Sequence, residues 1–278
     1  MAMLFKVAYL AVDNQAGGRP QGCHKFAFVH IPKTGGSTIL DMVRHEPLLQ
    51  HLHLTFEGMN GLGHNPAAEQ RARLTPTTWE RAFTFSVVRD PYDYAISQFI
   101  YHLDAHCGDL GNHSNTEQRA LPHSCMYAKA LATIQSHTDP IYRFAFKEWL
   151  SWLAGPGQFS AGAISMVRTH YRNSTIVTQK AWLTDVNDGY IVKHVVKLGS
   201  EEYNQVATCQ GLSQRLCSNW TSALCTKSKA SNVTNVVKST EHGTRYQYYD
   251  AESCEIVAKW FAEDFSAFEY NSSACPFP

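Results

Sequence analysis

A short loop of glycines, hydroxyl side chains and one lysine is the first segment of this sequence suited to chemistry. Residues 32–38 read Pro-Lys-Thr-Gly-Gly-Ser-Thr. Glycines let a backbone approach a phosphate closely, while the lysine supplies positive charge and the hydroxyls supply hydrogen-bond donors. Lys33 precedes the glycines, whereas the Walker A loop of nucleoside-triphosphate enzymes places its lysine after them. The segment therefore predicts an anion site of a different type.

A second anion-binding segment is centred on Arg89. Residues 87–97 read Val-Val-Arg-Asp-Pro-Tyr-Asp-Tyr-Ala-Ile-Ser, so Ser97 follows Arg89 by eight positions. A guanidinium offers the planar fork of donors that phosphate recognition favours. Two helical turns bring Ser97 to the same group, so Arg89 and Ser97 are expected to bind one phosphate.

Each of these segments is expected to connect a buried strand to a helix. The apolar runs 26–31 and 83–88 are rich in aromatic and β-branched residues and stop at proline or glycine, which predicts strands. Helical spacing follows at 37–44, with Ser37 as its cap, and at 91–103, with Asp90 as its cap. Strand ends beside helix N-termini form the usual anion site of open α/β sheets.

The two segments together resemble motifs of carbohydrate sulfotransferases of the Golgi, the heparan and chondroitin type, which use 3′-phosphoadenosine 5′-phosphosulfate (PAPS). Residues 30–38, His-Ile-Pro-Lys-Thr-Gly-Gly-Ser-Thr, are similar to the loop that binds the 5′-phosphosulfate. Arg89 and Ser97 are similar to the family's 3′-phosphate motif, although Tyr94 stands where the commoner pattern has Arg. The resemblance implies PAPS as co-substrate, since ATP lacks a 3′-phosphate.

The resemblance extends loosely from about residue 26 to residue 270. It implies contacts from a Lys-Ser pair in the C-terminal half, at Lys238 and Ser239, while Lys197 stands where many relatives carry Glu. No metal is implied. The expected cofactor-binding residues are Lys33, Thr34, Gly35, Gly36, Ser37, Thr38, Arg89, Ser97, Lys238 and Ser239.

Transfer of a sulfuryl group to an alcohol needs a base for the hydroxyl proton, and histidine suits this near neutral pH. The family keeps a histidine between the two motifs, often followed by an apolar residue and Thr or Ala, and His53 matches best. His51 is the alternative, because on an extended segment 51–55 both rings would face one side. Lys33 is expected to stabilise the departing phosphate.

The remaining pattern predicts a single α/β domain with a P-loop-like central parallel sheet flanked by helices. It occupies residues 26–278 and follows an N-terminal segment and linker, residues 1–25. A loop is expected at 57–66, and polar surface segments at 106–124 and 217–235. Further elements are a helix at 75–82 capped by Thr75, a helix at 139–153, a strand at 191–198, and helices at 200–216 and 251–261.

Composition limits the classes of partner. The chain has 278 residues, 44% of them hydrophobic, which is enough for one large core. Lys and Arg together equal Asp and Glu at 24 each, so nucleic-acid binding is not expected. A neutral balance favours a neutral or weakly charged glycan, or a small alcohol, over a strongly acidic polysaccharide.

Eight cysteines and five Asn-x-Ser/Thr sequons favour the lumen of the secretory pathway, and the resemblance favours the Golgi. Proximity suggests the disulfides Cys107–Cys125 and Cys254–Cys275. The apolar N-terminus is short for a membrane span, so any membrane anchor is expected upstream of this chain.

We therefore expect a sulfotransferase that moves a sulfuryl group from PAPS to a hydroxyl of a carbohydrate or related alcohol. The alternatives are a P-loop kinase that uses ATP and a nucleotide-binding relative without catalysis. The position of Lys33 before the glycines counts against the kinase. A histidine remote from Lys33 would favour the non-catalytic relative.

Overall fold

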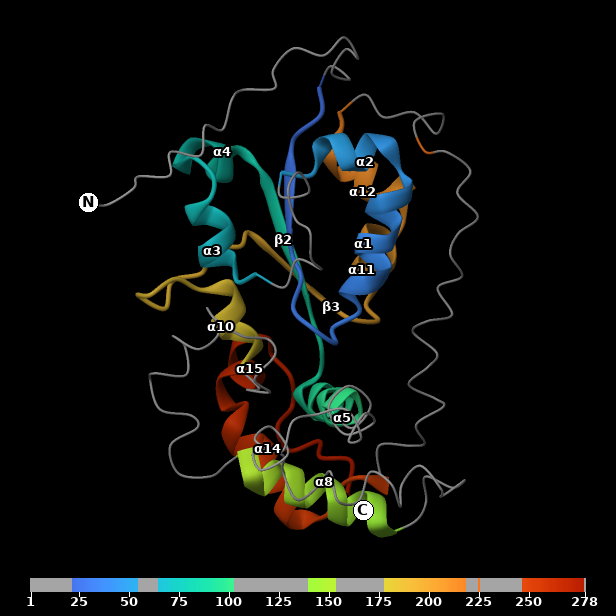
Figure 1. Ribbon diagram of the computed structural model, residues 1–278, viewed down its shortest axis with the longest axis vertical. Coiled ribbons are helices and arrows are strands. Elements are labelled where there is room, and N and C mark those ends of the chain that lie inside the picture. Colours follow the sequence, from blue (N-terminus) through green and yellow to red (C-terminus); the bar gives the residue numbers. More distant parts are fainter. Residues whose placement is uncertain are drawn as a thin grey trace, which may run out of the picture.

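Three of the predicted strands form one parallel sheet. The computed structural model describes residues 22–54, 65–102, 140–153, 178–218, 225 and 247–277. Strands β1 (Phe26–Val29), β2 (Phe83–Val88) and β3 (His194–Lys197) lie in the order β1-β2-β3 (Figure 1). Val29 pairs with Ser86, and Val88 pairs with Lys197. All three strands therefore point to the same edge of the sheet.

Side chains alternate between the two faces of the sheet and divide the core into two apolar clusters. Phe26, Phe28 and Phe85 belong to one cluster, whereas Ala27 and Val29 belong to the other. The first face is covered by α1 (Gly36–His45), α2 (Pro47–Leu52), α11 (Glu201–Val206) and α12 (Cys209–Leu216). On the opposite side lie α3 (Ala67–Ala72), α4 (Pro76–Arg81) and α10 (Gln179–Leu183) (Figure 1).

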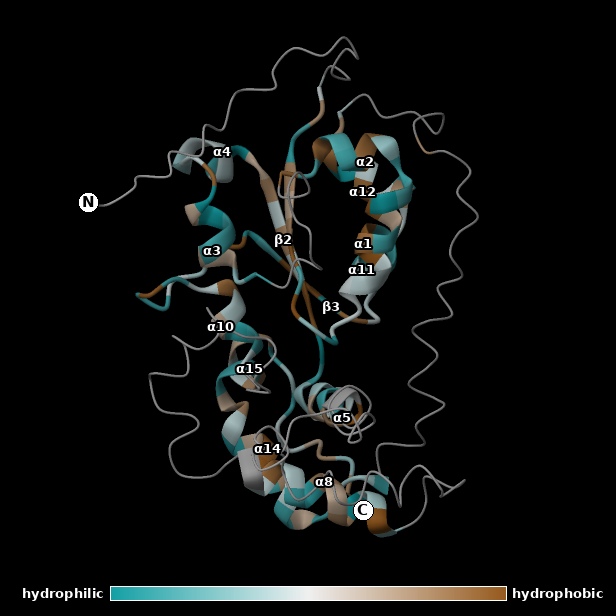
Figure 2. Ribbon diagram, viewed as in Figure 1, coloured by the Kyte–Doolittle hydropathy of each residue, from teal (hydrophilic) through white to brown (hydrophobic). Residues whose placement is uncertain are grey.

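Four helices lie beyond the carboxyl ends of the strands, toward the bottom of Figure 1. They are α5 (Pro91–His102), α8 (Pro140–Leu153), α14 (Ala251–Trp260) and α15 (Ala262–Ala267). Phe99 of α5 contacts both Phe146 and Trp149 of α8, with ring centroids 5.3 and 5.5 Å apart. Hydrophobic residues are concentrated on the strands and on parts of these helices (Figure 2). The described residues thus form one α/β body with a helical layer under the strand ends.

Several sequence-based expectations are confirmed. The strand 83–88 has the predicted bounds, and the strands predicted at 26–31 and 191–198 form with shorter bounds. Thr75 accepts a hydrogen bond from the Thr78 amide at 3.2 Å and caps α4 as expected. Asp90 accepts from the Tyr92 amide at 2.9 Å at the start of α5. Helices also form at the predicted positions 139–153 and 251–261.

Three local expectations are wrong. Helix α1 begins one residue before Ser37, so Gly35 and not Ser37 is its N-cap. The segment expected to be extended at 51–55 begins inside helix α2, because Pro47 starts a helix that runs to Leu52. The single helix expected at 200–216 is two helices, since the Thr208 hydroxyl accepts from the Gly211 amide and caps a second start.

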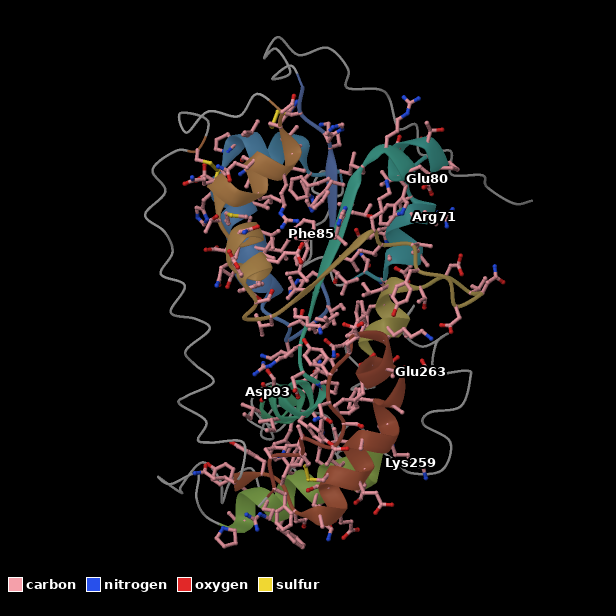
Figure 3. All side chains as sticks on the ribbon, turned by 180° about the vertical axis from the view of Figure 1, so that it is seen from behind. Arg71, Glu80, Phe85, Asp93, Lys259 and Glu263 are labelled. Atoms are coloured by element: carbon pink, nitrogen blue, oxygen red, sulfur yellow. A yellow bond between two sulfur atoms is a disulfide. The ribbon has the colours of Figure 1, made fainter. Side chains whose placement is uncertain are left out.

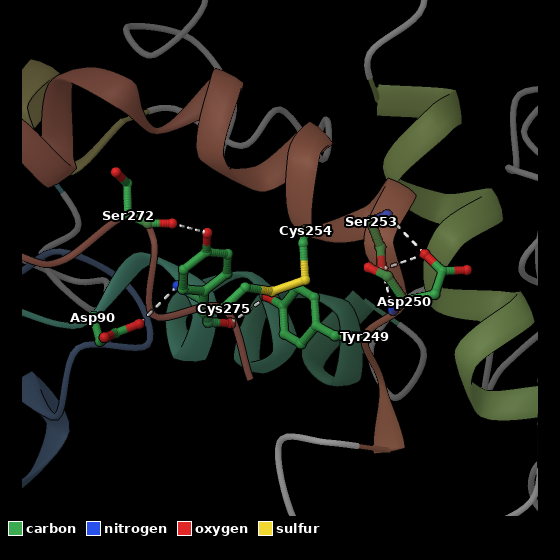
Figure 4. The surroundings of a disulfide bond; sticks show 8 residues. Asp90, Tyr249, Asp250, Ser253, Cys254, Ser272 and Cys275 are labelled. Atoms are coloured by element: carbon green, nitrogen blue, oxygen red, sulfur yellow. Dashed lines mark hydrogen bonds between the residues drawn. A yellow bond between two sulfur atoms is a disulfide. The ribbon is translucent and has the colours of Figure 1, made fainter. Parts of the chain in front are cut away.

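Three disulfides join the described parts of the chain. They are Cys23–Cys217, Cys209–Cys225 and Cys254–Cys275. The last confirms the predicted pair and lies beside α5, where the Tyr92 hydroxyl donates to the Ser272 carbonyl at 2.5 Å (Figure 4). Such bonds are compatible with an oxidising secretory or extracellular location. The predicted Cys107–Cys125 pair and the surface segment 106–124 lie outside the described residues, as do the loop 57–66 except residues 65 and 66 and the surface segment 217–235 except residues 217, 218 and 225.

None of the helices within the described ranges combines the length and the hydropathy needed to cross a membrane.

Candidate functional site

The glycine-bearing loop follows β1 and leads directly into helix α1. Lys33 has φ 66° and Gly35 has φ 86°, so the backbone passes twice through the left-handed region before the helix starts. The first turn of α1, residues 36–39, is fully described and contains no acidic side chain. The N–H groups at a helix start carry partial positive charge and favour an anion. The loop and α1 therefore have the strand–loop–helix arrangement that the sequence predicted, and its backbone is suited to an anion.

Both glycines of this loop lie against neighbouring side chains. A Cβ added at Gly36 would lie 2.2 Å from Cδ2 of His30, and one at Gly35 would lie 2.6 Å from Cδ1 of Leu198. The His30 ring is itself buried and stacks on Phe28, with ring centroids 5.8 Å apart. Glycine is favoured at position 35 by the positive φ of 86° and at position 36 by the closeness of the His30 ring.

Hydrogen bonds to the backbone hold the loop in this shape. The fully buried Thr34 hydroxyl donates to the Ile31 carbonyl at 2.9 Å, and the Tyr203 hydroxyl donates to the Gly35 carbonyl at 3.3 Å. The Thr34 side chain therefore stabilises the turn, and its backbone is the part suited to a ligand. Ser37 is exposed and Thr38 is partly buried, so their hydroxyls lie near the surface.

Arg89 joins the second motif to the first. It follows β2 at the same edge of the sheet, is partly buried, and donates from Nη1 to the Lys33 carbonyl at 3.3 Å. Ser97 lies two turns into α5, and Asp93 of the same helix is labelled beyond the end of β2 in Figure 3. The structure thus brings the Lys33 loop and Arg89 into contact, although 56 positions separate them.

The third strand ends in another cation. Lys197 pairs with Val88, and its Nζ lies 5.1 Å from the centroid of the Tyr270 ring. The Tyr270 hydroxyl donates to the Val88 carbonyl at 3.4 Å, and burial raises the pKa of this hydroxyl. Lys33, Arg89 and Lys197 therefore follow or end three adjacent parallel strands, so three cationic residues belong to one edge, and the carboxylates Asp90 and Asp93 lie near them.

The histidines proposed as bases lie at the other end of β1. His53 forms a parallel bridge with Phe26, the first residue of β1, and its ring contacts the Phe26 ring at 4.8 Å. From Phe26 to Val29 the strand rises about 10 Å, and the loop lies beyond that. His51 is exposed, and its carbonyl accepts from the Lys25 ammonium, which precedes β1. The structure therefore brings neither histidine to Lys33.

His53 is also strongly perturbed. Burial lowers its pKa from the ordinary 6.5 to about 4, because the charged ring would be removed from water. The ring is therefore neutral at pH 7. Its position against Phe26 assigns it to the core of the protein.

Four polar residues at this edge were not identified from the sequence. Gln98 donates to the Pro32 carbonyl at 3.5 Å, Tyr270 contacts Val88, and Gln179 and Asp264 hold the backbone at Arg89. Gln179, Asp264 and Tyr270 lie in segments that share the loose resemblance of the C-terminal half, at 179–184 and in the closing segment that ends at Tyr270, but the resemblance implied no role for them. Lys238 and Ser239 lie outside the described residues.

Within the described ranges, no group of three or more His, Cys, Asp or Glu side chains is arranged to hold a metal ion. No protein-family model, curated protein or solved structure matches this chain.

Proposed function

We propose that this protein is a PAPS-dependent sulfotransferase whose nucleotide binds at the carboxyl edge of the parallel sheet on a P-loop-like scaffold. The loop 32–38 would hold the 5′-phosphosulfate, and Arg89 with Ser97 would hold the 3′-phosphate. The acceptor is a hydroxyl of a carbohydrate or a related alcohol. The proposal combines the resemblance of these segments with the geometry of the edge.

The hydrogen bond from Arg89 to the Lys33 carbonyl is the observation that carries the proposal. It joins two cationic segments at the ends of neighbouring strands, whose axes lie about 4.8 Å apart. A nucleotide with phosphates on both its 3′ and 5′ positions matches two adjacent anion sites. A ligand with a single phosphate group would need only one of them.

The proposed reaction is an in-line substitution at sulfur. The acceptor oxygen forms a bond to sulfur while the bond from sulfur to the phosphate oxygen breaks, and the products are a sulfate ester and adenosine 3′,5′-bisphosphate. Lys33 and the amides of α1 would stabilise the negative charge that grows on the departing phosphate. The acceptor proton passes to a base, and the positions of His53 and His51 beside the start of β1 argue against both of these histidines.

The proposed location is the Golgi lumen, with a glycan as acceptor. The three disulfides support an oxidising compartment. The glycan and the Golgi both rest on the resemblance alone. The neutral net charge favours an acceptor with little charge of its own.

A second candidate is a protein that binds the same nucleotide without catalysing transfer. The placement of His53 and His51 beside the start of β1 favours this candidate. Both candidates predict the same nucleotide affinity, so a binding assay alone does not separate them. A transfer assay does.

The test measures binding of adenosine 3′,5′-bisphosphate by calorimetry, and transfer of labelled sulfate from PAPS to a panel of glycans and small alcohols. We expect the bisphosphate to bind and one acceptor class to become labelled. Arg89→Ala and Lys33→Ala should each abolish both signals. The matched controls remove exposed cations and are Arg81→Ala, at the end of α4 before β2, and Lys259→Ala, in the last turn of α14 (Figure 3 labels Lys259).

Each outcome separates the candidates. Binding without transfer to any acceptor would favour the non-catalytic protein. Transfer of phosphate from labelled ATP, with no affinity for the bisphosphate, would favour the kinase. Failure to bind the bisphosphate, ATP or PAPS would contradict a nucleotide site at this edge.

A further inference from the structure

One buried side chain occupies both backbone polar groups of Arg89. The Arg89 amide donates to Oε1 of Gln179 at 2.7 Å, and Nε2 of Gln179 donates to the Arg89 carbonyl at 2.8 Å. Gln179 has no exposed surface and lies 90 positions away in the sequence. The paired bonds fix the peptide groups on both sides of the Arg89 Cα, from which the guanidinium extends.

Asp264 in turn fixes Gln179. Oδ2 of Asp264 accepts from the Gln179 amide at 2.8 Å, and Oδ1 accepts from the Lys180 amide at 2.8 Å. The side-chain Nε2 of Gln179 is also 3.5 Å from Oδ2. Asp264 is fully buried on α15, so this carboxylate attaches the start of α10 to the C-terminal helix.

We propose that Gln179 and Asp264 are positioning residues that hold Arg89 in its anion-binding place, and that the carboxylate form of Asp264 is the form that does so. This inference rests on the proposed role of Arg89 in binding the nucleotide's 3′-phosphate. Neither residue needs to touch the nucleotide. They act through the Arg89 backbone.

The chemistry of the hydrogen bonds explains why the carboxylate is required. A carboxylate offers acceptor sites on both oxygens, and here the two oxygens accept from two backbone amides. Protonation converts one oxygen into a donor, which faces an N–H group and weakens that bond. The start of α10 is then held by one strong bond instead of two, and Gln179 becomes free to shift with Arg89.

Burial places this change at a moderately acidic pH. It raises the pKa of Asp264 from the ordinary 3.8 to about 6, and the N–H donors of Lys180 and Gln179 offset part of the rise. The charge of the neighbouring Glu263 raises the pKa further. The Lys180 ammonium is itself paired with Asp188 at 2.6 Å and with Glu263 at 3.7 Å. Among the described residues, Tyr190 and Tyr270 also interact electrostatically with Asp264.

Nucleotide binding and stability therefore respond to pH in opposite directions. Because the folded pKa of Asp264 is raised, its contribution to stability is present at low pH and is lost as pH rises through about 6. Binding should instead weaken as pH falls through the same range. A residue with a purely structural role would change binding and stability together.

The test is calorimetric binding of adenosine 3′,5′-bisphosphate between pH 5 and 8, for the wild type and for Asp264→Asn. Asparagine has one acceptor and one donor and so imitates the protonated acid. The matched control is Asp188→Asn, which removes an exposed carboxylate from the same Lys180 but leaves the bonds at Arg89 intact. The phosphates of the ligand also titrate near pH 6, and they contribute equally to all three proteins.

We expect Asp264→Asn to bind about five- to tenfold more weakly than the wild type at pH 7.5, the equivalent of one hydrogen bond. The difference in affinity between Asp264→Asn and the wild type should become smaller toward pH 5. The affinity of Asp188→Asn should equal that of the wild type at every pH. A constant ratio of affinities across this pH range would overturn the role of the carboxylate.

A second measurement needs neither the variant nor the nucleotide. The hydrogen-exchange protection factor of the Arg89 amide in the wild type, followed by NMR, should fall between pH 7.5 and pH 5. Unchanged protection would contradict the positioning role. Absence of bisphosphate binding by the wild type at pH 7.5, with protection that does fall, would instead refute the proposed nucleotide while leaving the positioning of Arg89 in place.

Discussion

Replacement of Gly36 by alanine tests whether the loop depends on its close packing against His30. The added Cβ would lie 2.2 Å from Cδ2 of His30, 2.7 Å from its Nε2 and 3.0 Å from Cζ of Phe28. Ordinary carbon contacts are about 3.5–4.0 Å, so the overlap exceeds about 1 Å. The His30 ring is buried and stacks on Phe28, so close packing opposes its rotation away from the added Cβ.

The expected result is a loss of stability of about 2 kcal/mol, typical of an overpacked core. Helix propensity predicts a small change in the opposite direction, because alanine is favoured over glycine by up to about 1 kcal/mol in a helix interior and Gly36 is the first residue of α1. The two expectations differ in sign. For a protein of this size, 2 kcal/mol corresponds to a fall in Tm of about 5 °C.

The assay is thermal unfolding of Gly36→Ala beside Gly189→Ala, where the nearest atom to an added Cβ is a side-chain oxygen 3.5 Å away. The control should change stability by less than about 0.5 kcal/mol. In a His30→Ala background, Gly36→Ala should lose at least half of its effect. A Gly36→Ala protein as stable as the wild type would refute the packing account of this loop.

Three further results are expected. Arg89→Lys should weaken binding of adenosine 3′,5′-bisphosphate about tenfold in calorimetry, because lysine lacks the guanidinium fork, and unchanged affinity would exclude a direct contact. The lowered pKa of His53, about 4, means that its contribution to stability is present above pH 6.5 and lost as pH falls toward 4, by about 3 kcal/mol. In urea unfolding at several pH values, His53→Gln should therefore reduce the loss of unfolding free energy on the acid side. An unchanged dependence of unfolding free energy on pH would contradict the lowered pKa of His53. Replacing Cys23 and Cys217 by serine should cost about 4–5 kcal/mol of unfolding free energy, since their disulfide closes a span of 194 residues, and a loss below about 1 kcal/mol would show that this closure contributes little.

The parallel sheet and the meeting of the Lys33 loop with Arg89 at one edge were predictable from local sequence. Runs of aromatic and β-branched residues that end at Pro32 or at Asp90-Pro91 indicate buried strands, and parallel strands end at a common edge. Because Lys33 and Arg89 each follow one of these strands, the common edge is enough to predict that they lie close together. These local patterns were sufficient to predict the strands, because few other secondary structures fit a short apolar run that stops at proline.

The segment around His53 was misread because its local pattern is ambiguous. His-Leu-His-Leu alternates like a strand, yet Glu46-Pro47 starts a helix that ends only at Leu52. The stronger signal was the proline at the first helical position. Because His53 then pairs with the start of β1, its distance from the loop depends on this helix and not on its own sequence motif.

The residues that hold Arg89 could not have been found from spacing. Gln179 and Asp264 are 85 positions apart, and they meet only because α10 packs on α15. The local sequence around Gln179 does not reveal whether its side chain is buried or exposed. Contacts of this kind follow from tertiary packing, which single-sequence patterns do not encode.

Comparison of adenosine 3′,5′-bisphosphate with adenosine 5′-diphosphate tests the central claim most directly. Both ligands carry an adenosine and two phosphate groups, and they differ in whether those groups occupy one end of the ribose or two. If Lys33 and Arg89 form adjacent sites for separate phosphates, the 3′,5′-bisphosphate should bind at least about tenfold more tightly in calorimetry, and Arg89→Ala should remove the preference. Equal affinity for the two ligands, or a preference for the 5′-diphosphate, would contradict the account.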